Sequence, residues 1–101
     1  MSMGSGSDAN PRDGDRITVD VDVRGDCVCV TRIDIHGCNA LGLVARELSE
    51  MAQGRSPQVV ARIAPREIIE RLGLGAEDER CALTAIGALR AAIVDAHVKA
   101  L

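Results

Sequence analysis

The sequence predicts an α+β fold, in which helices cover the apolar face of a small antiparallel β-sheet. Residues 16–36 alternate apolar and polar side chains with a period of two, broken once by a turn signal, which is typical of a β-hairpin. Residues 40–99 instead place apolar side chains three and four positions apart, which is typical of amphipathic helices. The change of period along the chain therefore predicts a sheet followed by its helical cover.

The hairpin is expected to pair residues 16–24 with residues 27–36, and a third short strand is compatible with the fold class. The apolar residues of both strands carry odd numbers, so odd must pair with odd, because a one-residue slip would turn one strand inside out. A three-residue turn over 24–26 satisfies this register. It places Cys27 and Cys29 on the apolar face, which favours core packing over a metal motif for this pair.

The helical part divides at its capping and stop signals. A helix over 40–53 ends before Gly54, and Ser56-Pro57 supplies an N-cap and a first helical residue. The last helix is expected to bury a stripe that begins at Leu83. The expected helices cover residues 40–53, 57–63, 65–72 and 77–99.

Length and composition restrict the possible functions. A chain of 101 residues fits one small domain, here residues 10–101, and the Gly/Ser-rich residues 1–9 are expected to form a flexible leader. The net charge of −3 and the absence of aromatic residues and of a basic stripe argue against a nucleic-acid partner. The sequence shows no export signal and no membrane-spanning apolar run, so we expect a cytoplasmic protein with reduced thiols.

Two of the four cysteines precede or open helices. Cys38 ends the second strand directly before a helix, and Cys81 lies in the first turn of the last helix, where the helix dipole favours a thiolate. The hairpin register brings Asp13 and Asp15 to the same end of the sheet as Cys38. Two thiolates with one or two carboxylates form a plausible ligand set for zinc or for iron–sulfur chemistry, and Arg80 adds a positive charge beside Cys81.

Simpler interpretations stay open for each of these residues. Free cysteine is often a small buried hydrophobe, so a helix-covered domain with buried thiols and no metal is an alternative. His36 is expected to be an exposed residue at the end of a strand, and His97 to complement the dipole of the last helix. No Ser/His/Asp or Cys/His constellation and no phosphate loop is evident, so we do not expect an enzyme.

Three motifs, in order and spacing, resemble those of the NifU/IscU-type iron–sulfur cluster assembly scaffolds. The family's Asn-Pro-x-Cys-Gly-Asp motif corresponds here to Asn10-Pro11-Arg12-Asp13-Gly14-Asp15. Its Gly-Cys at the end of the second strand corresponds to Gly37-Cys38, and the cysteine that opens its last helix corresponds to Cys81. The Gly-Lys-Thr that ends the family's first helix reads Gly54-Arg55-Ser56 here. The similarity covers residues 10–99.

The resemblance implies the fold shared by IscU-type scaffolds and SufE-type sulfur acceptors. It also implies a cytoplasmic scaffold that takes sulfur from a cysteine desulfurase, assembles a [2Fe–2S] cluster and passes it to apo-protein acceptors. Carried over by position, Cys38 and Cys81 would be cluster or Zn²⁺ ligands and persulfide acceptors. Asp15 matches the family's metal-binding aspartate, and Asp13 occupies the place of its first cysteine ligand.

The sequence departs from the family pattern at three places. Asp13 replaces a soft sulfur ligand with a hard oxygen ligand, which favours zinc over a cluster. Arg80 stands where many IscU-type members have histidine, although SufU-like members also carry a basic residue there. The Leu-Pro-Pro-Val-Lys segment that docks Hsp70-type chaperones is replaced by residues 75–78. A non-assembling paralogue that binds and regulates a desulfurase or another partner is the alternative function.

Overall fold

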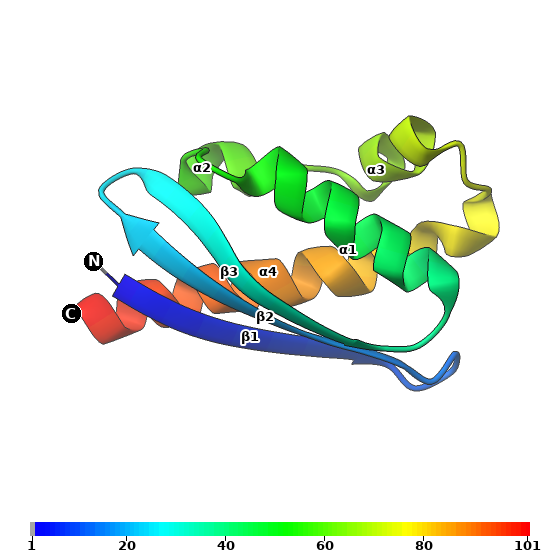
Figure 1. Cartoon of the computed structure of the whole chain (residues 1–101), viewed down its shortest axis with the longest axis horizontal. Helices are drawn as coiled ribbons and strands as arrows, with labels where there is room; N and C mark the ends of the chain where they lie inside the picture. Colours follow the sequence, from blue (N-terminus) through cyan, green and yellow to red (C-terminus); the bar gives the residue numbers. More distant parts are fainter. Residues whose placement is uncertain (1) are drawn as a thin grey trace.

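The computed structural model of the protein describes residues 2–101 and confirms the α+β class. Within this range, strands β1 (Ser2–Asn10), β2 (Asp15–Arg24) and β3 (Cys27–His36) form one antiparallel sheet in the order β1-β2-β3. The helical part then follows, as Figure 1 shows. It comprises α1 (Asn39–Ala52), α2 (Pro57–Val60), α3 (Pro65–Leu72), the 3₁₀-helix η1 (Ala76–Asp78) and α4 (Glu79–Ala100).

The helices cover one face of the sheet. α4 packs along β1 and β2, α1 contacts β3 and α4, and α3 packs on both α1 and α4. The core between these layers is aliphatic, and its largest fully buried apolar side chains are Ile17, Val21, Val28, Leu41, Val44, Val60, Ile68 and Leu89. Residues 76–100 are apolar and long enough to cross a membrane, but 56% of their most apolar stretch is buried inside the protein, as befits a core helix.

Strand β1 corrects the expected flexible leader over residues 1–9, of which residue 1 lies outside the described residues. Ser2–Asn10 pairs with β2 along its whole length, from Ser2↔Val23 to Asn10↔Asp15. The glycines explain why this strand was missed. Gly4 and Gly6 lie so close to α4 that a Cβ at either position would collide with the helix backbone around Ala92. The strand packs through its backbone, so it shows no apolar alternation.

The β2–β3 hairpin differs from the expected register in its turn. Arg24 pairs with Cys27, so the turn holds only Gly25 and Asp26, with Gly25 at φ +60°. Glycine at the first central position of a two-residue turn is typical of a type II′ hairpin. An irregularity opposite Asp20 and Val21 then inserts one extra residue in β3, which is a β-bulge.

The shorter turn reverses the face of the first half of β3. Val28 becomes fully buried, whereas Cys27 is exposed and Cys29 half-buried on the other face, so the expected core packing of this cysteine pair is wrong. After the bulge Ile33 and Ile35 lie opposite Val19 and Ile17, on the core side again.

Two helical details also differ from expectation. Helix α2 ends at Val60 rather than at residue 63, and Ala64 adopts the extended conformation that a following proline favours. Leu83 is 55% exposed, whereas the rest of the expected stripe of the last helix, including Ile86 and Leu89, is buried, and Ala82 takes the place of Leu83 at its start.

Candidate metal site

Three chain segments meet at one end of the sheet. The β1–β2 turn, the β3–α1 connection and the start of α4 lie together at the right-hand end of Figure 1. Asp15 opens β2, Cys38 is the N-cap residue of α1, and Cys81 lies in the first turn of α4. Each residue is therefore fixed by the end of a regular element, although the three are far apart in the chain.

The donor atoms of these residues form a compact triangle. The two Sγ atoms of Cys38 and Cys81 are 3.8 Å apart, and Asp15 Oδ2 lies 3.5 Å from Cys81 Sγ and 4.0 Å from Cys38 Sγ. For a tetrahedral zinc ion with ordinary Zn–S and Zn–O bonds, the S···S separation is about 3.8 Å and the S···O separation about 3.5 Å. The two edges that meet at Cys81 Sγ therefore match one metal ion, and the edge from Asp15 Oδ2 to Cys38 Sγ is about 0.5 Å longer than this ideal.

Asp15 is the most buried member of the group. Its side chain is 2% exposed, and its Oδ1 atom accepts a hydrogen bond of 3.2 Å from the backbone N–H of Cys38. A buried carboxylate loses hydration, so it needs close partners of this kind. The bond leaves Oδ2 facing the two sulfurs, which fixes the orientation of the triangle.

Gly37 makes room for Asp15. Its φ of +154° is unfavourable for other residues, and a Cβ at this position would collide with Asp15 Oδ1. Glycine at position 37, directly before Cys38, is thus required by the position of Asp15 as well as by its own backbone conformation.

A Gly37→Ala variant should displace the Asp15 carboxylate and destabilise the fold by about 1–3 kcal/mol. Metal affinity should fall by about tenfold, because the third donor no longer faces the sulfurs. Gly14→Ala is the matched control, since Gly14 also has a positive φ (+72°) but nothing lies within 4 Å of its Cβ position. Urea unfolding and metal titration of both variants check this, and equal metal affinity in the two would contradict it.

Burial raises the pKa of the Cys81 thiol to about 12, with hydrogen bonds to Cys38 and Asp15 acting in the same direction. Burial thus acts against the preference for a thiolate that the place of Cys81 in the first helical turn predicts. The thiol is protonated at neutral pH, so a metal ion must displace its proton on binding.

Asp13 lies beside the triangle rather than in it. Its Oδ2 atom accepts a 2.8 Å hydrogen bond from Asn10 Nδ2 and lies 3.8 Å from Arg80 Nη1. Asp13 and Arg80 lie near the two cysteines, as expected, because all four residues line one cleft. The structure ties the two side chains to each other at the rim.

The cleft has a volume of about 400 Å³ and opens over the triangle. Glu77 and Asp78 of η1 also line the cleft, beside Cys81. No pattern in the sequence signals this, since it depends on the path from α3 to α4.

The other candidate residues lie elsewhere. His36 is exposed at the end of β3, and His97 Nδ1 is 2.9 Å from the carbonyl oxygen of Ile93, one turn earlier in α4.

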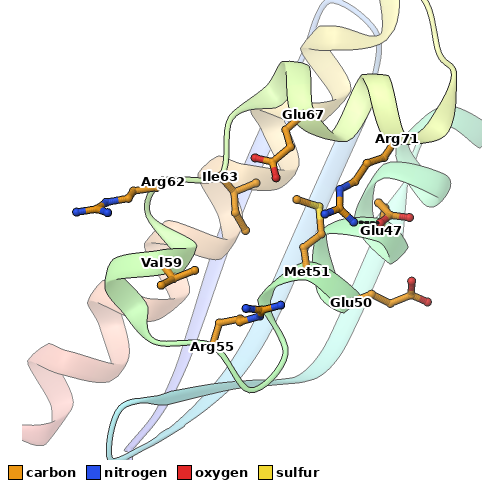
Figure 2. A pocket seen from close by; sticks show the side chains of 9 residues that line it. All are labelled: Glu47, Glu50, Met51, Arg55, Val59, Arg62, Ile63, Glu67 and Arg71. Atoms are coloured by element: carbon orange, nitrogen blue, oxygen red, sulfur yellow. Dashed lines mark hydrogen bonds and ion pairs between the residues drawn. The ribbon is translucent and has the colours of Figure 1, made fainter.

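A larger groove of about 480 Å³ separates α1 from α2 and α3. Figure 2 shows its apolar floor of Met51 and Ile63, with Arg71 3.5 Å from Glu47 at one side. None of the metal-site residues lines this groove.

Fold and site together define a small α+β domain in which one aspartate and two cysteines form a metal-binding group at the end of the sheet. The chain belongs to the family of the NifU-like N terminal domain, which matches residues 1–101. It is 31% identical over 93 residues to the "Iron-sulfur cluster assembly scaffold protein IscU 1" of Archaeoglobus fulgidus and, to the same extent, to "IscU 2" of that organism. These alignments cover 91% of this chain but 61% of each relative. The resemblance to the NifU/IscU family is thus confirmed.

Proposed function

We propose that the protein is a scaffold in iron–sulfur cluster assembly, with Asp15, Cys38 and Cys81 as the ligands of its metal ion or cluster. The observation that carries the proposal is the spacing of the three donor atoms, which all lie within 4.8 Å of one another. Family membership and the scaffold function in the names of the two archaeal relatives support the same conclusion.

The donor set fits the groups that the proposal requires. Thiolates bind zinc and iron–sulfur clusters, and the added carboxylate makes the set harder than three thiolates. Three donors this close together suit one ion, and they leave a tetrahedral ion one donor short. We infer that zinc or a single iron occupies the resting site, and that a [2Fe–2S] cluster is the cargo that the scaffold assembles.

Asp13 is a further candidate ligand, because it lines the cleft at the position of the family's first cysteine. To reach a metal it would give up its hydrogen bond from Asn10 and its ion pair with Arg80. Arg80 thus holds Asp13 at the rim in the metal-free state. We propose that this exchange of partners accompanies loading and release.

Cys38 is the better candidate for accepting sulfur. Its side chain is exposed, whereas Cys81 is 4% exposed and protonated. A cysteine desulfurase that acts in the cytoplasm would be the partner. The Cys38 thiolate would attack the terminal sulfur of the desulfurase persulfide, so that a new persulfide forms on Cys38 and the desulfurase thiolate leaves.

The test is anaerobic loading of the full chain with zinc, and separately with iron and sulfide. We expect stoichiometric zinc binding by metal analysis and a cluster absorption band after reconstitution, both prevented by prior alkylation of Cys38. A protein that stays folded but binds neither metal in stoichiometric amount contradicts the scaffold function.

The alternative function, a regulatory paralogue, differs from the scaffold function in one measurable step, the transfer of sulfur from the desulfurase to this protein. Mass spectrometry after incubation with a desulfurase and cysteine should find the added sulfur on Cys38. A protein that binds the desulfurase and changes its rate, yet never carries persulfide, would support the regulatory function instead.

A further inference from the structure

A third hollow lies between β3, at the outer edge of the sheet, and α1, away from the metal site. Its volume is about 350 Å³, and β3 contributes Ile33 and Ile35 to its wall. Gly42, Ala45 and Ser49 of α1 form the opposite wall. We call this hollow the β3–α1 groove, and Figure 1 shows β3 and α1 running beside each other along it.

The strand side of the groove has free backbone groups. In an antiparallel pair, alternate residues turn both N–H and C=O away from their partner strand. Val28 and Val30, which lie opposite Val23 and Val21, face away from β2 in this way. Their outward backbone groups form hydrogen bonds with residues 53–55.

Ile33 and Ile35 continue the same alternation beyond the bulge. They lie opposite Val19 and Ile17, the odd-numbered residues of β2 that turn away from β3. Within residues 2–101, no segment covers the outward groups of Ile33 and Ile35 as residues 53–55 cover those of Val28 and Val30. Such an edge is a template for a further strand.

The other edge of the sheet is less open to such pairing, because side-chain carboxylates occupy two of its outward N–H groups. The N–H of Ser5 in β1 donates to Asp95 Oδ2 on α4 at 2.9 Å, and that of Ala9 donates to Asp8 Oδ1 at 2.8 Å. Side-chain carboxylates therefore occupy donors of β1 that an added strand would need. Residues 33–35 of β3 form the open template.

The helix side of the groove is built to leave space. Gly42, Ala45 and Ser49 are all small, and they recur at helical spacing on the side of α1 that faces β3. A Cβ added to Gly42 would meet nothing within 4 Å. An apolar side chain pointing inward from an added strand would contact Ile33 on one side and this small-residue surface on the other.

We propose that the β3–α1 groove binds an extended segment of a partner protein, which adds to β3 as a fourth strand and inserts an apolar side chain toward α1. Backbone hydrogen bonds supply affinity in this mode of recognition, and pockets for alternate side chains supply selectivity. A second copy of this chain fits less well, because it would bring its own α1 to an edge that α1 already flanks.

Charge defines the chemistry of the segment. Arg32 and Asp34 flank Ile33 on the outer face of β3 and form an ion pair of 3.8 Å with each other. Their side chains are 71% and 70% exposed, so this pair is weak and each charge can exchange it for one on the added strand. Arg46 and Glu50 stand along the groove on α1. An antiparallel segment would therefore carry a basic residue opposite Asp34, an apolar residue opposite Ile33 and an acidic residue opposite Arg32. This inference does not depend on metal binding.

The probe is a fluorescein-labelled, amidated peptide of sequence Thr-Val-Lys-Val-Glu-Val-Thr, titrated into the full-length, metal-free chain at low salt. We expect saturable binding, with the amide protons of Ile33 and Ile35 gaining about tenfold protection from exchange in NMR spectra. Binding that protects other amides, or no saturable binding, would overturn the proposal. Self-association that protects the same amides without peptide would also overturn it, in favour of a second copy.

Two variants sharpen the test. Gly42→Leu fills the groove from the helix side and removes a helix glycine, so the chain should stay folded while peptide affinity falls at least about tenfold. Glu70→Leu, at an exposed position of α3 outside the groove, is the matched control and should bind normally. Asp34→Lys should lower the affinity for the peptide, and replacing the peptide's Lys with Glu should restore that affinity. Unchanged affinity in Gly42→Leu would overturn the proposal even if wild type binds.

Discussion

A Cys81→Ala variant is expected to lose metal affinity by about 100-fold or more while keeping its fold. The substitution removes one of three donor atoms, and loss of a mere supporting contact around a metal already costs 10–100-fold. Cys81 is also a small buried side chain on α4, so replacing its sulfur with hydrogen leaves only a slight void. Competition with a chromophoric zinc chelator measures the affinity, and circular dichroism checks the fold.

Cys29→Ala is the matched control for this loss. Cys29 is a half-buried free thiol on the outer face of β3, and it lies outside the group formed by Asp15, Cys38 and Cys81. The control should bind zinc as the wild type does. If both variants lose binding equally, the zinc is held by thiols in general and not by the site at the end of the sheet.

A Gly6→Val variant is expected to lose about 3 kcal/mol or more of folding stability. A Cβ at this position would collide with the backbone of Ala88 and Ala92 in α4, and a helix backbone cannot move aside as a flexible side chain can. For a domain of this size the melting temperature should fall by more than about 10 °C. Thermal unfolding followed by circular dichroism measures the change.

Ser5→Val is the control for strand propensity. Ser5 neighbours Gly6 in β1 but its side chain is exposed, and valine favours strands. Its melting temperature should therefore stay within a few degrees of wild type. A Gly6→Val protein that melts no lower than Ser5→Val would show that β1 does not pack tightly on α4.

Side-chain periodicity predicts the type of most elements correctly, but it does not reveal a strand or a bulge that depends on backbone contacts. Helices α1, α3 and α4 follow from apolar spacing, and β2 follows from its alternation with Asp20 and Asp22. Strand β1 left no such signal, because its partner surface is the alanine-rich side of α4 about ninety residues later. The bulge in β3 was missed because a two-residue turn and a three-residue turn differ by a single position.

The candidate site was predictable where it depends on the ends of elements. Residues at the start of β2, the end of β3 and the start of the last helix had to converge in an antiparallel sheet with a helical cover. The separation of Asp13 from the triangle was not predictable, because it depends on competition from Asn10 and Arg80 within the β1–β2 turn and across the cleft. The high pKa of Cys81 likewise reflects a depth of burial that sequence alone does not give.

The contact between the first strand and the last helix also determines when the domain can finish folding during synthesis. Gly4 and Gly6 leave the ribosome about ninety residues before the helix backbone around Ala92 and Ala96 against which they rest. A nascent chain that ends before α4 has the sheet's strands but lacks their main covering helix, so its apolar side stays open to water. Completion of this domain's fold is therefore a late event, in which its first strand closes onto a helix that is translated about ninety residues later.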